Sequence, residues 1–330
     1  MKKQLLIWQF IHKNLQQNIH VMLLYVLESN GSSPGRQGFF MAVNAHGGME
    51  GSIGGGIMEH KFVELAKEKW REHENNIEIK KQIHDKNAVK NQSGMICSGE
   101  QTILLYHVKK EDRQTIQQII YCLEHHQNAL LQLSLKGISF SSTIPEKDFL
   151  FEMESENKWL YQEKLGYKNH LHIIGGGHCA LAFSKLMNTM DFYIHLYDDR
   201  KGLNTFLRNE YVHEKKIIND YSELKNIIPS GKNHYVVIMT FGYRTDDIAL
   251  RALLGKQFKY IGVLGSKKKM EKMFLDYRKE GFKEAMLKSI HSPIGISIKS
   301  ETPEEIAISI AAEIIQVKHS IDFFEKNQKT

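Results

Sequence analysis

Apolar residues in the first part of the chain follow two different spacings. Helical spacing predicts helices over residues 4–17, 57–71 and 111–124. Continuous apolar runs, which are typical of buried strands, lie at residues 21–27, 39–43, 102–108 and 129–135. Since these strands and helices do not alternate regularly, this part is expected to form an α+β domain.

From residue 170 onward, strands and helices alternate regularly. Apolar runs predict strands at residues 170–174, 193–197, 235–240 and 260–264, and helical stretches separate them. The last helix has a clear beginning, because Thr302 is a good N-cap, Pro303 suits the first helical position and Glu305 completes a capping box. The alternation predicts a Rossmann-like, doubly wound parallel sheet with helices on both faces.

The chain is therefore expected to be an α/β protein with two domains. An N-terminal α+β domain is predicted over residues 1–140, and a Rossmann-like domain over residues 169–330. Residues 141–168 consist of short strand-like pieces broken by Ser, Pro and Lys, and they are predicted to connect the two domains. A length of 330 residues is sufficient for two cores of ordinary size.

Composition and charge argue against several classes of function. The chain is 42% hydrophobic and 25% charged, as in ordinary globular proteins. Its net charge is +6, but Lys and Arg are interleaved with Asp and Glu, so no nucleic-acid partner is expected. The N-terminal residues lack a signal-peptide pattern and no apolar stretch reaches the length of a membrane span, which predicts a cytoplasmic protein with no membrane partner.

The three cysteines, Cys97, Cys122 and Cys179, are too few and too scattered for a disulfide framework. No CxxC pair suggests zinc, so no metal site is predicted. Cys97 lies in a loop of small residues before a strand, where a thiol is a candidate nucleophile or soft-metal ligand. The alternative is an inert residue, which is what we expect of the other two cysteines.

The most informative motif is a glycine-rich turn between a strand and a helix. Gly175 would allow the tight turn, Gly177 would allow a phosphate to approach the backbone, and Ala180 replaces the third glycine where the helix meets the strand. The helix N-terminus that follows favours an anion. Asp198 ends the next strand, near the spacing at which such folds place an acid on ribose hydroxyls. The alternative is a structural turn that binds no nucleotide.

A second strand-to-helix turn is predicted at Gly265, Ser266 and Lys267. Lysines at residues 267–269 occupy the first helical turn, where the helix dipole favours acids instead. An anionic ligand at this edge of the sheet would relieve that conflict. The alternative is that the lysines simply face water.

Two loops of small residues stand out in the first half, at residues 31–36 and 51–56. The second loop ends in Gly54, Gly55 and Gly56 and opens a helix, so its amides are candidates for binding an anion. Arg36, in the first loop, could pair with that anion, and Glu59 falls on the first turn of the helix. The alternative is that these glycines only form turns.

Together these segments resemble the XdhC/CoxI family, the accessory factors of xanthine dehydrogenase and related molybdenum hydroxylases. In the first half, the resemblance rests on the segments at residues 31–36, 38–43 and 51–59. In the second half, it rests on the glycine loop and on residues 198–200, 261–267, 293–295 and 302–310. The resemblance covers nearly the whole chain.

What the resemblance implies is a maturation factor and not the hydroxylase itself. Such a factor would bind the molybdenum cofactor (molybdopterin), assist its sulfuration and deliver it to an apo molybdenum hydroxylase. A cysteine desulfurase is an implied partner, and a homodimer is the implied assembly. The glycine loops would hold the phosphate or nucleotide part of the cofactor, and a thiol such as Cys97 could approach its soft metal–dithiolene centre.

The chain departs from the family pattern at two places. The usual Thr-His-x-His segment is replaced by Thr240-Phe241-Gly242-Tyr243, so no role of those histidines carries over. The usual Cys-Gly-Gly is replaced by Cys97-Ser98-Gly99, which keeps the thiol but loses one glycine. A divergent client or an altered chemistry would be consistent with both changes.

Two other functions are compatible with the sequence. One is an NAD(P)-dependent oxidoreductase that uses the glycine loop and Asp198, although no His or Lys is convincingly placed for hydride chemistry. The other is a regulator that senses a nucleotide without catalysis. Bound pterin, turnover with NAD(P) and binding without turnover would distinguish the three functions.

Overall fold

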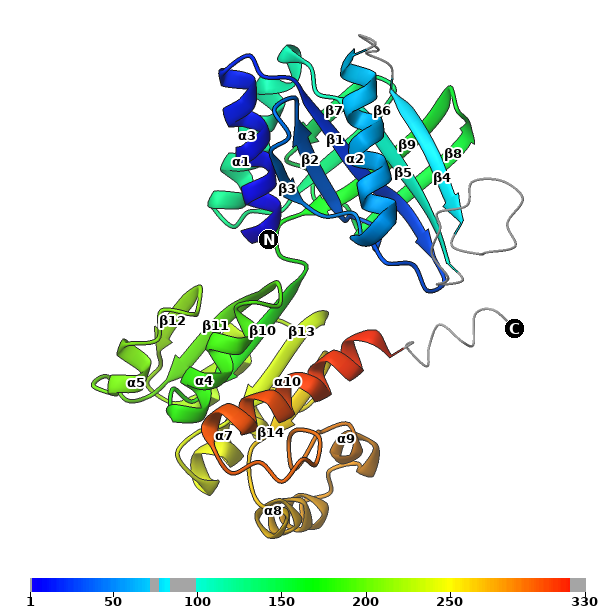
Figure 1. Ribbon diagram of the computed structural model, residues 1–330. Coiled ribbons are helices and arrows are strands. Elements are labelled where there is room, and N and C mark those ends of the chain that lie inside the picture. The colour runs from blue at the N-terminus through cyan, green and yellow to red at the C-terminus, as the bar shows by residue number, and fades with distance from the viewer. Residues whose placement is uncertain (1, 72–76, 84–98, 321–330) are drawn as a thin grey trace. The chain divides into compact units, whose positions relative to one another are not determined.

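The computed structural model describes residues 2–71, 77–83 and 99–320 (Figure 1). The chain divides into two compact units, Met1–Tyr167 and Lys168–Thr330. Each unit has its own sheets and its own buried core.

The first unit contains two antiparallel sheets. The five-stranded sheet has the order β3-β2-β1-β5-β4, and the four-stranded sheet has the order β7-β6-β9-β8. The helices are α1 (Lys2–Gln16), α2 (Gly56–Arg71) and α3 (Arg113–Glu124), with a short 3-10 helix η1 (Lys110–Asp112) before α3. The strands are β1 (Val21–Asn30), β2 (Phe40–Asn44), β3 (Met49–Gly51), β4 (Glu78–Ile83), β5 (Glu100–His107), β6 (Ala129–Ser134), β7 (Gly137–Ser141), β8 (Phe149–Ser155) and β9 (Lys158–Leu165).

Strand β1 lies in the middle of the five-stranded sheet and is buried on both faces. Met22 and Leu24 belong to the cluster that packs under α2. Tyr25 faces the other way, and its hydroxyl donates a 2.6 Å hydrogen bond to the buried carboxylate of Glu163 on β9. Tyr161 donates to the same oxygen over 2.8 Å, so a single carboxylate joins residues from both sheets.

Residues 141–168 differ from the connecting segment that the sequence predicts. Most of this stretch forms β8 and β9, which pair with each other and join β6 within the first unit. The boundary between the compact units falls after Tyr167, at the end of that stretch. The sequence pattern predicts strand-like pieces here, but the pairing of β9 with β6 is seen only in three dimensions.

The second unit is a parallel sheet in the order β12-β11-β10-β13-β14. Its strands are β10 (Asn169–Ile174), β11 (Phe192–Asp198), β12 (Glu214–Ile217), β13 (Gly231–Ile238) and β14 (Phe258–Val263). Its helices are α4 (His178–Met187), α5 (Asn204–Leu207), α6 (Leu224–Ile227), α7 (Tyr243–Leu253), α8 (Lys267–Lys279), α9 (Glu284–Lys288) and α10 (Pro303–His319), with the 3-10 helix η2 (Tyr221–Glu223) before α6. The predicted α/β class and the Rossmann-like sheet are confirmed.

Helices cover both faces of this sheet, as Figure 1 shows. One face packs against α4 and α10 around Ile173, Ile194 and Ile310. The other face packs against α6, α7, α8 and α9 around Ile238, Leu250 and Met273. Because α4 follows β10 on one face and α7 follows β13 on the other, the two loops diverge between neighbouring strands. Open α/β sheets bind ligands in the crevice at such a point.

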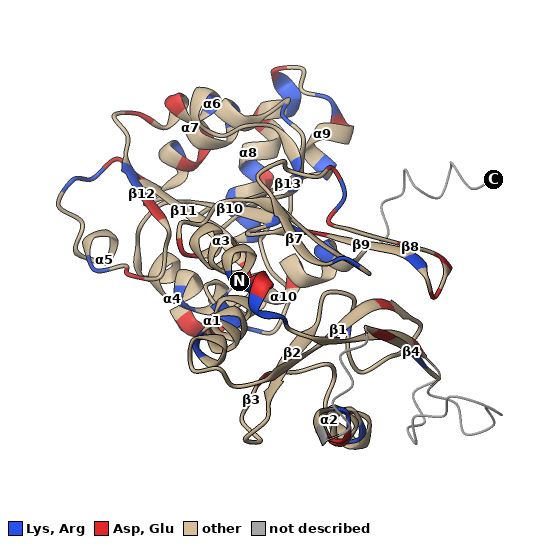
Figure 2. Ribbon diagram, turned by 90° about the horizontal axis from the view of Figure 1, so that it is seen from above, with Lys and Arg blue, Asp and Glu red and all other residues tan. Residues whose placement is uncertain are grey.

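Acidic and basic residues are interspersed along the ribbon in both units (Figure 2). Within the described residues, no helix is long and apolar enough to cross a membrane. The predictions of a cytoplasmic location and of no nucleic-acid partner stay predictions.

Candidate functional site

The glycine-rich loop after β10 forms the tight turn that the sequence predicts. Gly175 has φ +106°, and a Cβ atom there would lie 2.3 Å from the carbonyl oxygen of Met239, so only glycine fits. Gly177 is the N-cap of α4, and no atom lies within 4 Å of the place where its Cβ would be. The helix therefore begins beside open space, as an anion-binding terminus requires.

Asp198, at the end of β11, is fully buried and its carboxylate is engaged by the protein itself. One oxygen accepts a 2.6 Å hydrogen bond from the amide of Gly176. Arg200 supplies its amide at 2.9 Å and its guanidinium at 2.7 and 2.8 Å. Burial raises the pKa of Asp198, but the hydrogen bonds from Arg200 and Gly176 outweigh burial and bring the pKa below its usual value.

This carboxylate holds the glycine loop and Arg200 in place, and it is not open to a ribose. Asp199, the next residue, is the more accessible acid, with its side chain 34% exposed. Its carboxylate accepts a 3.1 Å hydrogen bond from the hydroxyl of Tyr221. The contact of Asp198 with a cofactor stays a prediction, and its observed partners favour an indirect role.

The guanidinium of Arg200 and the ring of Phe241 form a surface beside the glycine loop, with the guanidinium over the face of the ring. The guanidinium carbon of Arg200 lies 5.7 Å from the centre of the Phe241 ring. Phe241 follows β13 on the other side of the crevice and is 86% exposed, the most exposed of the large apolar side chains described. An exposed aromatic ring next to a fixed guanidinium suits a planar, electron-rich ligand.

The loops after β13 and β14 are tied together by a second buried carboxylate. Asp246, on α7, accepts hydrogen bonds from the amide of Thr240 at 2.9 Å and from its hydroxyl at 2.6 Å. Lys269 forms an ion pair with the other oxygen of Asp246. The carboxylate of Asp246 thus compensates the charge of one of the three lysines in the first turn of α8.

The three residues predicted at this turn take different positions. Ser266 is the N-cap of α8, and its hydroxyl accepts a hydrogen bond from the amide of Lys269. Gly265 lies against the aliphatic part of the Lys269 side chain. The ammonium group of Lys267 is 3.9 Å from the Glu271 carboxylate, and its side chain is 84% exposed. Lys267 and the exposed Lys268 are therefore the lysines of this turn that a ligand could reach.

In the first unit, the glycine loop before α2 already holds an anion. One oxygen of Glu59 accepts hydrogen bonds from the amides of Ile53 and Gly55, both at 3.0 Å, and from the Ser52 hydroxyl at 2.7 Å. The position of Glu59 on the first helical turn also suits the helix dipole. The amides that the sequence offers to a ligand are thus partly used by the chain itself.

The two small-residue loops of the first unit pack closely against each other. A Cβ on Gly54 would lie 2.5 Å from the amide nitrogen of Gly35, so the close approach requires glycine. The Arg36 guanidinium donates a 2.9 Å hydrogen bond to the carbonyl of Gly31, within its own loop. Gly55 and Gly56 have φ of +77° and +70°, a conformation that favours glycine.

The structure thus groups the predicted residues into two sets. One set lies along the carboxyl edge of the second-unit sheet and consists of Gly175, Gly177, Asp198 and the turn at residues 265–267. Ala180 lies beside them but is fully buried, so it serves packing between α4 and the sheet. The other set lies in the first unit and consists of Arg36, Gly54, Gly55, Gly56 and Glu59.

Cys97, the predicted reactive thiol, lies outside the described residues. Burial raises the pKa of the Cys122 thiol to about 11 and also raises the pKa of Cys179. Neither of these two cysteines has the lowered pKa that a thiolate nucleophile needs.

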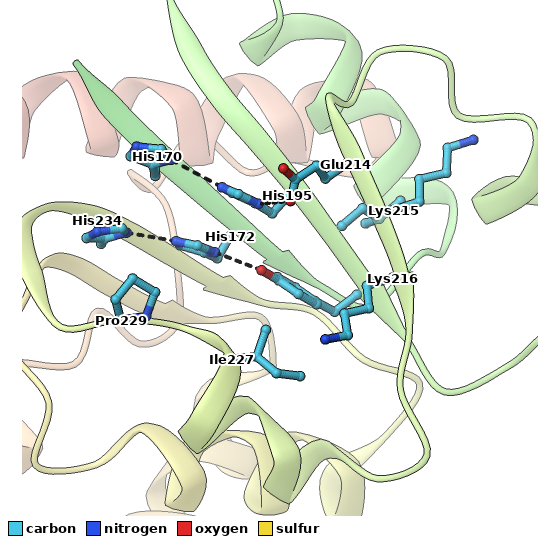
Figure 3. Close-up of a pocket in the computed structure, with 11 residues that line it drawn as sticks. His170, His172, His195, Glu214, Lys215, Lys216, Ile227, Pro229 and His234 are labelled. Carbon is cyan, nitrogen blue, oxygen red and sulfur yellow. Dashed lines mark hydrogen bonds and ion pairs between the residues drawn. The ribbon is translucent and has the colours of Figure 1, made fainter. Parts of the chain in front are cut away.

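Sequence reasoning missed a cluster of four histidines on the second-unit sheet (Figure 3). We call it the histidine cluster: His170 and His172 on β10, His195 on β11 and His234 on β13. Parallel strands covered on both faces are usually continuous apolar runs. The signal in the sequence is the pair of histidines at alternate positions of β10, with one more histidine on each of β11 and β13. Only the strand register brings the four residues together.

The histidines form two hydrogen-bonded rows. In one row, His234 and His172 are joined over 2.9 Å, and His172 lies 3.2 Å from the hydroxyl of Tyr197. In the other row, His170 and His195 are joined over 3.2 Å, and His195 lies 3.0 Å from Glu214. Burial, and then the neighbouring imidazoles, lower the pKa of His172 to about 2.

Two family models match the chain. Residues 171–314 match the XdhC Rossmann domain, and residues 15–79 match the XdhC and CoxI family. A crystal structure described as a xanthine dehydrogenase from Bacillus halodurans superimposes with a TM-score of 0.68 at 23% identity, over 95% of this chain and 96% of that chain. At this level of identity, the similarity establishes the fold alone.

Two curated proteins are also similar to the chain. YqeB of Escherichia coli (strain K12), an uncharacterised protein, is 24% identical over 311 residues, which cover 92% of this chain and 45% of YqeB. A probable xanthine dehydrogenase subunit of Bacillus subtilis (strain 168) is 32% identical over 85 residues, which cover 26% of this chain and 24% of that protein. The matched parts thus span less than half the length of either relative.

The first prediction concerns Asp198. Replacing it in Asp198→Asn weakens the hold on Arg200 and on the Gly176 amide, and we expect the second unit to lose about 2 kcal/mol of unfolding free energy. Asp199→Asn is the matched control, because the side chain is partly exposed, and it should stay within about 0.5 kcal/mol of the parent. Urea denaturation of both variants tests this, and equal losses would contradict it.

The second prediction concerns pH. An unfolded histidine titrates near 6.5, whereas His172 stays neutral in the fold down to a pKa of about 2. The unfolded state therefore binds more protons below pH 6.5, and stability falls by about 1.4 kcal/mol per pH unit for this residue. Urea denaturation between pH 7.5 and 5 should show a slope that is shallower in His172→Phe, and an unchanged slope would count against this.

Proposed function

Because the chain belongs to the XdhC and CoxI family and carries an XdhC Rossmann domain, we propose that it is an accessory protein of a xanthine-dehydrogenase-type molybdenum hydroxylase. It binds the molybdenum cofactor as cargo, assists its sulfuration and delivers it to the apo-enzyme. A cysteine desulfurase is the expected sulfur source, and a homodimer is the expected assembly.

The observation that carries the proposal is the set of groups at the carboxyl edge of the second-unit sheet, where the loops after β10 and β13 diverge. Besides its metal–dithiolene centre, this cargo has a pterin ring system and a phosphate that a protein can recognise. The start of α4 at Gly177 offers amides and a positive dipole to the phosphate. The surface formed by Arg200 and Phe241 offers a place for the ring.

The same edge is better suited to holding a ligand than to transforming it. Asp198 and Asp246 are buried, and both use their oxygens to hold loops and cations of the protein. General acid–base catalysis needs a group that reaches the ligand with a suitable pKa. Neither of these buried and engaged carboxylates reaches a ligand at this edge, which supports a carrier over an oxidoreductase.

One observation favours a second candidate ligand. Arg200 stands just after the second strand of the glycine-loop motif, where an arginine accommodates the 2′-phosphate of NADP in Rossmann folds. Since Asp198 is engaged by the protein, it is not open to the ribose diol of NAD, and the partly exposed Asp199 is the acid that remains nearby. If the domain binds a dinucleotide, as an oxidoreductase or a nucleotide-sensing regulator would, NADP is the expected form.

The direct experiment is mass spectrometry of the native protein purified without added ligand. A bound pterin supports the carrier, and a bound dinucleotide supports the second candidate. Titration with NADP and with NAD shows which group recognises the ribose. Tighter binding of NADP indicates Arg200, and tighter binding of NAD indicates a carboxylate. If the protein has no bound pterin, gains none from isolated molybdenum cofactor and does not activate an apo-hydroxylase, the proposal fails.

The third prediction tests the glycine loop. Gly177→Val should fold, because the Cβ position is open, but its side chain should block approach to the α4 amides and weaken ligand binding by roughly ten-fold or more. Gly202→Val is the matched control, since Gly202 also has open space around the Cβ position. Titration with isolated molybdenum cofactor and with NADP measures the effect, and undiminished binding of both would contradict it.

The fourth prediction tests the thiol. Cys97→Ala should reduce retention of the cofactor or sulfuration of the client, because the thiol predicted to approach the metal–dithiolene centre is removed. Cys122→Ala serves as the control, since Cys122 lies on α3 and burial raises the pKa of its thiol to about 11. The measurement is the activity of the client hydroxylase matured with each variant, and full activity with Cys97→Ala would exclude the role.

A further inference from the structure

The histidine cluster lies where the rest of the fold would place apolar side chains. On the opposite face of the same strands, Leu171, Ile194 and Tyr235 are buried in the core under α4 and α10. On the histidine side, the covering helix is α6, which has only four residues. The short crossover leaves this part of the sheet lining a cavity of about 750 Å³.

The four imidazoles form a compact block (Figure 3). Strand register places His172 beside His195 and His170 beside His234, and the ring centres of these pairs are 4.5 and 5.1 Å apart in stacked orientation. Each ring therefore has one neighbour over its face and another in hydrogen-bond contact. Four nitrogen donors are concentrated on one wall of a cavity.

Glu214 fixes the protonation of one row. Register places Glu214 opposite His195, and a carboxylate only accepts hydrogen bonds, so Nδ1 of His195 carries the proton. In the neutral ring, Nε2 then carries a lone pair that faces Nδ1 of His170. A carboxylate that orients an imidazole in this way is the usual outer partner of a metal-binding histidine.

We propose that the histidine cluster binds a divalent transition-metal ion of the zinc, nickel and copper group. Imidazole is a preferred ligand for these ions. With bonds of about 2.0–2.1 Å, two nitrogens on one tetrahedral ion are about 3.3 Å apart. The nitrogen pairs of the cluster, at 2.9 and 3.2 Å, are already close to that separation.

Coordination requires the rings to turn out of their present contacts. The nitrogens meet in pairs, and among the described residues no three His, Cys, Asp or Glu side chains already surround one metal position. The torsion that turns a histidine ring is soft, and the cavity offers space for the movement and for water or another ligand. Two imidazoles and solvent are the smallest ligand set that the proposal needs.

The cavity is lined by one acidic side chain, which favours a cation, and by two lysines. Glu214 lies beside the rings, and its carboxylate accepts hydrogen bonds from both His195 and Tyr193. Lys216 also lines the cavity and would oppose a metal ion. Lys215 lines it too, but its ammonium group donates to the carbonyl of Leu207. Replacing Lys216 therefore distinguishes a cation site from an anion site.

The test uses the full-length protein, stripped with a chelator and dialysed. Titration with Zn²⁺ followed by calorimetry should show saturable binding, and Cu²⁺ should give an electron paramagnetic resonance spectrum with nitrogen ligands. Mg²⁺ and Ca²⁺ should not bind, because they prefer oxygen ligands. These readouts do not depend on the molybdenum cofactor, so the proposal stands or fails separately from the proposed function.

Three variants make the assignment specific. His195→Phe should weaken Zn²⁺ binding at least ten-fold, and Glu214→Gln, at a side chain that is 59% exposed, should weaken it by roughly 10- to 100-fold without removing an imidazole. Lys216→Met should strengthen it. The matched control is His107→Phe, because His107 and His20 form a similar nitrogen pair at 3.0 Å in the first unit.

Each outcome supports or overturns the site. Weaker Zn²⁺ binding in His195→Phe and Glu214→Gln, with binding in His107→Phe unchanged, supports it. Equal binding in all variants, or no saturable binding by the parent protein, overturns it. Binding of inorganic phosphate that weakens in Lys216→Met, with no metal binding, would also overturn it, because the cavity would then be an anion site.

Discussion

The structure depends on carboxylates that accept hydrogen bonds from loop amides. Asp198 holds the loop after β10, Asp246 holds the loop after β13, and Glu59 holds the loop before α2. A loop amide buried without a partner costs free energy, and glycine-rich turns have no side chains of their own to supply one. An acid from a neighbouring element meets this need and fixes the loop before any ligand arrives.

This arrangement also determines what the carboxyl edge of the second-unit sheet can do. With Asp198 bound to Arg200 and Asp246 bound to Lys269, the two acids are neutralised by cations of the protein. The start of α4, the guanidinium of Arg200 and the exposed ring of Phe241 stay accessible to a ligand. Their chemistry is suited to an anion and a flat ring, which is consistent with the proposed carrier.

Much of the fold could be predicted from the sequence, because strands such as β10 and helices such as α10 have strong periodicity and clear end signals. Strand β12 could not, since Glu214–Ile217 is a short, charged edge strand. The tight turn at Gly175 followed from residue types alone. The partner of Asp198 could not be predicted in this way. Spacing indicates only that an acid is near the loop, and the structure is needed to show that the guanidinium of Arg200 occupies that acid in place of a ribose.

The histidine cluster is a second feature that could not be predicted from the sequence alone. Each histidine taken singly, in a strand of otherwise apolar residues, is compatible with a satisfied core position. Only the parallel register of β11, β10 and β13 makes four of them neighbours. Neutral imidazoles that share hydrogen bonds are tolerated in a core, but four of them on a cavity wall exceed what packing requires. Parallel sheets covered by helices usually carry apolar residues at such positions, and this departure is the reason for proposing a ligand at this face.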